Sequence, residues 1–151
     1  MTDEFQTEEL LLLLKKISID METRLDRKLK KQDISGTQVY FLAYILRHHP
    51  DGTYITQLCR EIGVSKATVS ALVKKLREKG YLYFLEDPKD IRKKMVFPTE
   101  QLKDKREELL AQVQQMENEI CRVLNLKEKK QLRELEQKML LGLKKDEEVT
   151  P

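Results

Sequence analysis

The residues best suited to chemistry are small hydroxyls and cations near the middle of the chain. Ser65, Lys66, Ala67, Thr68 and Ser70 fall on the outer face of a predicted helix. Ser and Thr hydroxyls can donate to or accept from base edges, and Ala67 or the Thr68 methyl group can contact a thymine methyl group. The amino terminus of a helix also attracts phosphate. The pattern therefore favours contact with the major groove of DNA.

Further cations follow this helix start. Lys74 and Lys75 would reach the DNA backbone and position the helix without reading sequence. A second group crowds a turn held by Pro88, and it consists of Lys89, Arg92, Lys93 and Lys94. A basic loop beside a recognition helix can enter the minor groove, where Arg senses groove width and potential. A bare charge run is usually a solvated turn, but its place directly after the predicted helices favours DNA.

The charge distribution supports the same interpretation. The 151 residues carry a net charge of +3, yet residues 53–98 hold ten Lys or Arg against five acids, which leaves the remainder at −2. A basic block between near-neutral flanks is typical of a phosphate-facing module in a larger scaffold. With two His in the chain and no Gly-rich phosphate loop, HExxH or GxSxG motif, no catalytic constellation is predicted. We therefore expect no enzyme and no cofactor.

The element that must position these residues is a helix-turn-helix. Helices are predicted over 56–62 and 66–79, with Gly63 permitting the sharp turn, Ser65 as N-cap and Gly80 ending the second helix. The shared core is predicted to hold Leu58, Ile62, Val64, Val69 and Leu72. The alternative is an ordinary amphipathic helix pair. Its exposed face would be expected to carry more Glu and fewer hydroxyls on the first two turns.

The rest of the chain is predicted to be mainly helical around a β-hairpin. The expected helices cover 4–31, 37–49 (capped by Ser35 or Thr37), 99–124 and 127–143, and the hairpin pairs residues 81–86 with 95–97. Apolar residues on 4–31 form one stripe, namely Leu10, Leu14, Ile17, Met21, Leu25 and Leu29. A near-heptad seam on 99–124, namely Leu102, Leu109, Val113, Met116, Ile120 and Val123, suits a partner helix.

These motifs together resemble the MarR family of winged-helix regulators over nearly the whole chain. Residues 65–82 are similar to the family's recognition helix and its exit into the wing. Asp87-Pro88 and Asp90-Ile91-Arg92 resemble the wing with its Asp-x-Arg signature, and residues 98–100 resemble the step to the next helix. The departure is Ala71, where many relatives have Arg; Lys74 and Lys75 would compensate for it.

The resemblance implies a mainly α, α+β winged-helix fold with dimerisation helices at both ends. The expected organisation is a dimerisation helix over 1–33, a winged helix-turn-helix over 34–98, dimerisation helices over 99–145 and a disordered tail over 146–151. It also implies a homodimer that binds a pseudo-palindromic operator, most often as a repressor released by a small molecule or by oxidation. The residues that would then face bases are Ser65, Lys66, Ala67, Thr68 and Ser70. Lys74 would contact a phosphate, and Arg92 would enter the minor groove.

Two further groups of side chains have simpler explanations beside the functional ones. Tyr40, Tyr44 and His48 share a helix face; they could line the family's cleft for an aromatic or phenolic effector, and interface packing would explain them equally well. The adjacent His48 and His49 point in different directions, so a helix cap is favoured over a metal site. For Cys59 and Cys121 a structural role is favoured over redox sensing.

The function expected from the sequence is that of a DNA-binding transcription regulator. The alternative is a winged-helix adaptor that binds protein and has lost DNA, but hydroxyls and lysines on the recognition face argue against it. The acidic amino terminus is unlike a signal peptide, and the Leu10–Leu14 run is too short to cross a bilayer. We therefore expect a cytoplasmic, nucleoid-associated protein of a bacterium or archaeon, with no membrane partner.

Overall fold

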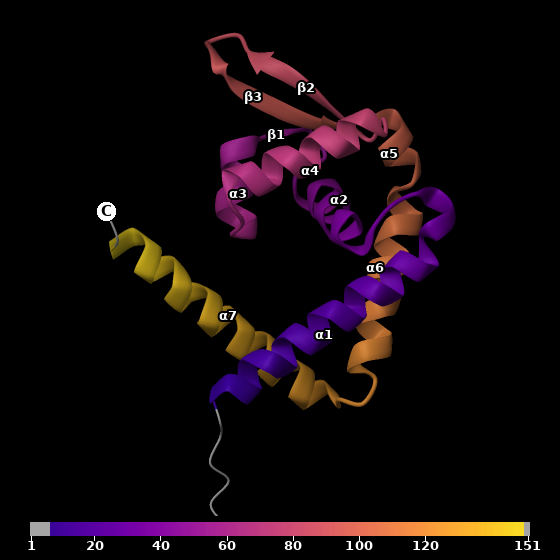
Figure 1. Ribbon diagram of the computed structural model, residues 1–151, viewed down its shortest axis with the longest axis vertical. Helices are drawn as coiled ribbons and strands as arrows, with labels where there is room; N and C mark the ends of the chain where they lie inside the picture. The colour runs from indigo at the N-terminus through magenta and orange to yellow at the C-terminus, as the bar shows by residue number, and fades with distance from the viewer. Residues whose placement is uncertain (1–6, 150–151) are drawn as a thin grey trace, which may run out of the picture. The chain divides into compact units, whose positions relative to one another are not determined.

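The computed structural model describes the backbone of residues 7–149, and their side chains except those of residues 7, 91, 92 and 145–149. The chain divides into two compact units after Met116. The elements of Figure 1 are α1 Thr7–Lys28, the 3-10 turn η1 Lys30–Gln32, α2 Gly36–His48, β1 Thr53–Tyr54, α3 Ile55–Ile62, α4 Lys66–Glu78, β2 Leu82–Asp87, β3 Asp90–Pro98, α5 Glu100–Asp104, α6 Arg106–Cys121 and α7 Leu126–Val149.

The carboxyl-terminal half of α1 packs closely on the start of α2. Leu25 and Leu29 of the predicted stripe are fully buried. Gly36 approaches α1 so closely that an added Cβ would lie 2.5 Å from the carbonyl oxygen of Glu22. Ser35 forms a capping box with Gln38, so Ser35 is the cap of this helix. The missing side chain at Gly36 thus lets the two helix backbones meet.

The helix-turn-helix matches the prediction closely. Gly63 follows α3 with a φ of 82°, and the Ser65 hydroxyl accepts a hydrogen bond from the Thr68 amide at 3.2 Å, capping α4. Gly80 follows α4 with a φ of 84°. Leu58 and Val69 are fully buried as expected. Val64 was expected in the core, but it is 37% exposed because it lies in the turn ahead of the helix cap.

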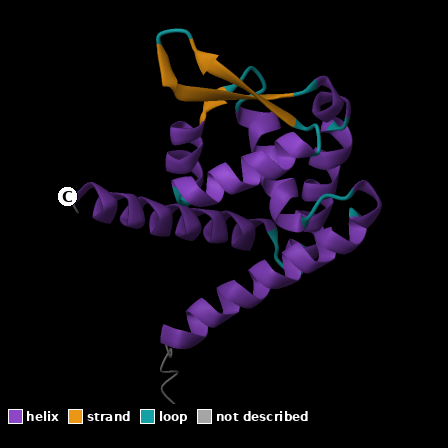
Figure 2. Cartoon of the chain, turned by 45° about the horizontal axis from the view of Figure 1, so that its top comes forward, coloured by secondary structure: helices purple, strands orange, loops and turns teal. Residues whose placement is uncertain are grey.

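The wing is a three-stranded antiparallel sheet in the order β1-β3-β2, seen in orange in Figure 2. The second strand was predicted as residues 95–97, but β3 runs from Asp90 to Pro98 and pairs along β2. The two-residue strand β1 was not predicted; Thr53 pairs with Val96 and Tyr54 with Met95. This third strand ties the base of the hairpin to the start of α3.

The helices after the wing differ from the single helix predicted over 99–124. The chain forms α5, capped by the Thr99 hydroxyl, and then α6, with a break at Lys105. Leu102, Leu109 and Met116, at seven-residue spacing, are fully buried within the first unit. These members of the predicted seam are therefore covered by this chain itself.

In the second unit, Asn125 caps α7. Oδ1 of Asn125 accepts a hydrogen bond from the backbone amide of Glu128, and the backbone amide of Asn125 donates one to Oε1 of Glu128, each at 2.9 Å. The helix continues to Val149, beyond the predicted end at residue 143. Leucines and a methionine on α7 are 40–60% exposed, namely Leu132, Leu135, Met139, Leu140, Leu141 and Leu143. No helix within residues 7–149 is both long enough and apolar enough to cross a membrane.

Candidate nucleic-acid interface

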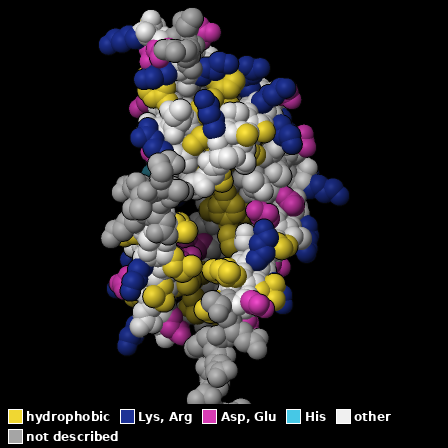
Figure 3. All heavy atoms as spheres, turned by 60° about the vertical axis from the view of Figure 1, so that its left-hand side comes forward, with side chains coloured by type: hydrophobic (Ala, Val, Ile, Leu, Met, Phe, Trp, Pro, Cys, Tyr) yellow, Lys and Arg dark blue, Asp and Glu magenta, His cyan; other side chains and the backbone are white. Residues whose placement is uncertain are grey.

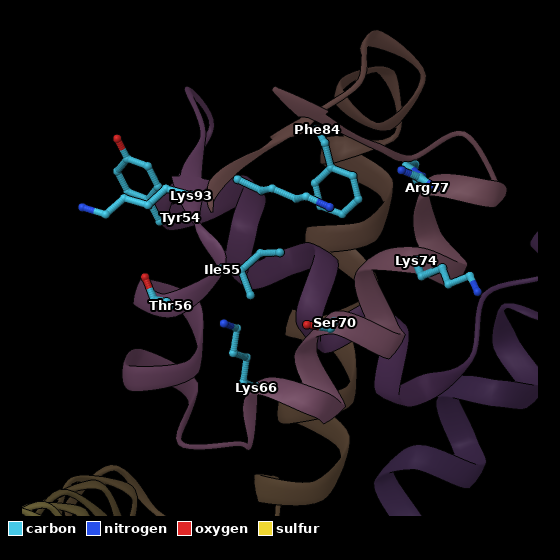
Figure 4. A pocket seen from close by; sticks show the side chains of 10 residues that line it. Tyr54, Ile55, Thr56, Lys66, Ser70, Lys74, Arg77, Phe84 and Lys93 are labelled. Carbon is cyan, nitrogen blue, oxygen red and sulfur yellow. The ribbon is translucent and has the colours of Figure 1, made fainter. Parts of the chain in front are cut away.

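A basic groove of about 430 Å³ separates α4 from the wing. It is lined by Tyr54, Ile55, Thr56, Lys66, Ser70, Lys74, Arg77, Phe84, Lys93 and Lys94. Five of these ten side chains are cations and none is acidic. In Figure 4, Lys66, Ser70 and Lys74 project from α4, while Phe84 reaches the groove from the wing. Figure 3 shows Lys and Arg side chains gathered around the wing end of the molecule.

The α4 wall of the groove follows from helical spacing. Lys66, Ser70, Lys74 and Arg77 are separated by four, four and three residues, which places them on one face of the helix. The neighbouring side of α4, roughly a quarter turn away, carries the fully buried Val69, Val73 and Leu76. Because that apolar side is fixed in the core, the basic side lies at the edge of the core and faces the groove.

The wing wall of the groove is organised by Phe84. Its ring centroid lies 5.0 Å from Cζ of Arg77 on α4 and 5.5 Å from Nζ of Lys94 on β3. Both distances fall in the range where a cation is attracted to the face of an aromatic ring. Phe84 therefore contacts cations from both walls.

A second aromatic residue, Tyr54, is hydrogen-bonded to the hairpin turn of the wing. The Tyr54 hydroxyl donates to Asp87 Oδ2 at 2.9 Å, and the Lys89 amide donates to Asp87 Oδ1 at 2.9 Å. Nζ of Lys93 lies 6.0 Å from the Tyr54 ring centroid. The hydrogen bonds from Lys89 and Tyr54, with the nearby charge of Lys93, lower the pKa of Asp87. A charged Asp87 thus holds the hairpin turn against β1.

The hydroxyls at the start of α4 are engaged with each other. Oγ of Ser65 and Oγ1 of Thr68 are 2.8 Å apart, in addition to the bond from the Thr68 amide. Ser65, Thr68 and the neighbouring Ala67 are all exposed. In this arrangement Ser65 stabilises the helix end, and the rest of the exposed turn is open to a ligand.

The structure brings together some of the predicted site residues. Lys66, Ser70, Lys74 and Lys93 line the groove. Lys75 and Lys89 are exposed but do not belong to its lining. The side chain of Arg92 lies outside the described residues.

Sequence reasoning did not single out Arg77, Phe84 or Tyr54, although all three line the groove. Lys94, which the sequence placed in the cationic group at the wing turn, lines it as well. Helical spacing from Lys66 and Lys74 could have indicated Arg77. The two aromatic residues gave no sequence signal, because their role depends on cations from other elements.

The proposed effector residues meet a polar junction between α2 and α3. The Tyr44 and His48 rings are 4.6 Å apart, while the Tyr44 hydroxyl donates to Glu61 Oε2 at 2.7 Å. His49 Nε2 lies 2.6 Å from the same oxygen, and Gln57 donates to Oε1 of Glu61 at 3.0 Å. Tyr40 is half-buried on the same helix. The junction therefore ties α2 to the first helix of the helix-turn-helix.

The pKa values at this junction follow from these contacts. Partial burial alone would raise the pKa of Glu61, but hydrogen bonds from His49, Tyr44 and Gln57 outweigh it and lower the pKa to about 2. Burial, with the neighbouring Glu61, raises the pKa of Tyr44 to about 12. Glu61 is thus charged and Tyr44 neutral at physiological pH.

Two other groups considered from the sequence can be located. Cys59 and Cys121 are both half-buried thiols without a disulfide. Among the described side chains, no three His, Cys, Asp or Glu are grouped so as to hold a metal ion.

Comparison with known proteins identifies similar domains. Residues 32–93 match the model of the MarR family. No curated protein sequence matches the chain. In structure the chain is similar to MepR of S. aureus in a complex with DNA, at 28% sequence identity and a TM-score of 0.81, covering 89% of this chain and 97% of that one.

Two further solved structures support the same fold. A MarR protein from Peptoclostridium difficile has 21% identity and a TM-score of 0.85, with 97% of this chain and 94% of that chain covered. The transcriptional regulator SlyA has 20% identity and a TM-score of 0.84, with 94% of this chain and 99% of that chain covered. At these identities the likeness establishes the winged-helix fold, as the sequence predicted.

Proposed function

We propose that this chain, whose residues 32–93 match the model of the MarR family, is a sequence-specific regulator of transcription that binds double-stranded DNA. The observation that carries the proposal is the groove between α4 and the wing, whose lining holds five cations and no acid. Such a surface attracts the phosphate backbone, while the exposed Ala67 and Thr68 can meet base edges. The solved structure of MepR with DNA supports this use of the domain.

The proposal includes a homodimer that binds a pseudo-palindromic operator. Three apolar side chains on one face of the amino-terminal half of α1 remain 44–48% exposed, namely Leu10, Leu14 and Ile17, and such an exposed apolar stripe is unfavourable for an isolated chain in water. A second copy would cover such a surface. Two recognition helices would then meet half-sites about 10 bp apart in adjacent turns of the major groove.

The finer part of the proposal is a repressor whose release from DNA is triggered by a signal. Tyr40, Tyr44 and His48 would contact a small aromatic or phenolic effector. Because Tyr44 and His49 are hydrogen-bonded to Glu61 on α3, an effector that displaced Tyr44 would also disturb the helix-turn-helix. Oxidation of Cys59 or Cys121 is the other candidate signal. The protein would act in the cytoplasm, on chromosomal DNA of the nucleoid.

The first experiment measures binding to DNA from the region upstream of the protein's own gene, by fluorescence anisotropy over a range of salt concentrations. We expect the logarithm of the association constant to fall with the logarithm of salt concentration, with a slope of roughly −0.9 per phosphate contacted. Lys66→Gln with Lys74→Gln should make that slope shallower by roughly 1.8. The control, Lys129→Gln with Lys130→Gln, changes two exposed lysines on α7 and should leave the slope unchanged.

Two outcomes would count against the proposal. No binding to any duplex at low salt would favour the adaptor without DNA binding. Equal slopes for the groove and control variants would mean that DNA binds elsewhere. The Arg92→Ala variant tests the wing by itself: it should weaken binding, and unchanged affinity and sequence preference would remove the wing from the interface.

A further inference from the structure

We propose that Phe84 is a positioning residue for DNA binding, whose ring holds Arg77 and Lys94 in place before the DNA arrives. This inference rests on the proposed function, because it concerns how the same groove meets phosphate. It assigns a role to an aromatic side chain that need not touch the DNA itself. It also adds two cations, Arg77 and Lys94, to the set that contacts the backbone.

The arrangement is set by three separate elements. Phe84 belongs to β2 and pairs with Val96 on β3, a residue that is fully buried, so the height of the ring in the sheet is fixed. Lys94 lies two residues before Val96 and therefore on the same face of the sheet. Arg77 comes from the last turn of α4, on the face shared with Lys74. All three side chains meet at the groove.

The ring offsets two costs of this arrangement. Two cations held near one point repel each other, and each flexible side chain loses conformational freedom when it binds. The negative face of the ring attracts both cations, at 5.0 Å for Arg77 and 5.5 Å for Lys94. Ordering one long side chain at an interface typically weakens affinity by roughly two- to tenfold. Side chains ordered in advance avoid much of that loss.

The environment of Phe84 differs from that of a core aromatic residue. Phe84 is half-buried and lines the groove, whereas the neighbouring Tyr83 points to the other face of the sheet and stacks on Phe97 with centroids 5.2 Å apart. A ring needed for packing alone would not have to lie between two cations. Tyr83 thus offers a matched control, because it is an aromatic residue on the same strand.

The experiment compares Phe84→Leu, Phe84→Tyr and the control Tyr83→Leu, in the wild-type chain and in an Arg77→Gln/Lys94→Gln background. Affinity for the upstream DNA is measured by fluorescence anisotropy, and folding is checked by the thermal unfolding midpoint. In the wild-type background, Phe84→Leu should weaken binding roughly three- to tenfold. Phe84→Tyr, which keeps the ring, should bind like wild type, and so should Tyr83→Leu.

The double background separates positioning from general loss of structure. Where Arg77 and Lys94 have no charge, Phe84→Leu should have no further effect on affinity, because there is no cation left to hold. An equal loss in both backgrounds would mean that Phe84 acts through packing, and the inference would be wrong. The same conclusion would follow if Phe84→Leu bound like wild type. Failure of the wild-type chain itself to bind any duplex would instead overturn the proposed function.

Discussion

The two halves of α1 follow one apolar spacing but meet different surroundings. Leu25 and Leu29 are fully buried against the rest of the first unit, whereas Leu10, Leu14 and Ile17 of the same stripe are 44–48% exposed. The apolar residues of α7 are exposed to a similar extent. Periodicity therefore predicts which face of a helix is buried. Which element packs on that face depends on the tertiary fold or on a second copy of the chain.

The largest effect is expected where the comparison points to a second copy. Leu10→Gln, Leu14→Gln and Ile17→Gln together should raise the dimer dissociation constant roughly a few thousandfold. Each substitution would remove about 0.8 kcal/mol of the free energy gained by burying apolar surface on dimerisation, and six side chains are affected in a dimer. Sedimentation equilibrium measures the constant.

The control for that variant lies on the opposite face of α1. Leu12 and Ile19 are each 51% exposed but fall about half a turn from the stripe. Leu12→Gln with Ile19→Gln should leave the dissociation constant unchanged. Equal weakening by the two variants, or a wild-type chain that stays monomeric at micromolar concentration, would contradict the proposed interface.

The next largest effect is expected in the helix-turn-helix, whose core is buried within a single chain. Leu58 is fully buried in the helix-turn-helix, so Leu58→Ala should lower the free energy of unfolding by about 2–5 kcal/mol. Leu11 is 65% exposed, so Leu11→Ala should lower the free energy of unfolding by less than about 0.5 kcal/mol. Urea unfolding measures both values. Similar losses at the two positions would mean that exposure in the single chain does not describe the protein in solution.

The sequence was most informative where structure is set by neighbours along the chain. Ser65 as a helix cap and the glycines 63 and 80 after α3 and α4 were all predicted, because capping and positive φ are local properties. The break at Lys105 was missed, since no Pro or Gly marks it. The strand β1 was missed because two residues show no alternation; it exists through its pairing with β3.

The candidate site shows the same division. Lys66, Ser70 and Lys74 could be predicted from helical spacing, and all three line the groove. The contribution of Phe84 could not be predicted, because it depends on Arg77 from α4 and Lys94 from β3 meeting at one ring. Glu61 was likewise not singled out, because its partners come from another part of the chain: Tyr44 lies on α2 and His49 directly follows that helix.

Two glycines should respond in opposite directions to the same change. Gly36→Ala should lower the free energy of unfolding by about 1–3 kcal/mol, because the new Cβ would meet the Glu22 backbone, which cannot give way cheaply. Gly142 lies within α7 with no atom within 4 Å of an added Cβ, so Gly142→Ala should raise helix stability by about 0.5–1 kcal/mol. Urea unfolding followed by circular dichroism would test both. A loss at Gly142 would show that this part of α7 is covered closely in solution.

The smallest effect is a pH dependence at the junction of α2 and α3. Because the folded-state pKa of Glu61 is lowered from 4.5 to about 2, its contribution to stability is present above pH 4.5 and is lost as the pH falls toward 2. For this partly exposed carboxylate the loss should be about 1 kcal/mol once solvent screening is included. Glu61→Gln should remove that part of the pH dependence, as measured by urea unfolding at pH 6 and pH 3. Glu134→Gln changes an exposed carboxylate on α7 and should behave like wild type. If Glu61→Gln and wild type lose stability in parallel, the hydrogen bonds from Tyr44 and His49 do not stabilise the charged form of Glu61. The junction is then a weaker link between α2 and the helix-turn-helix than its distances indicate.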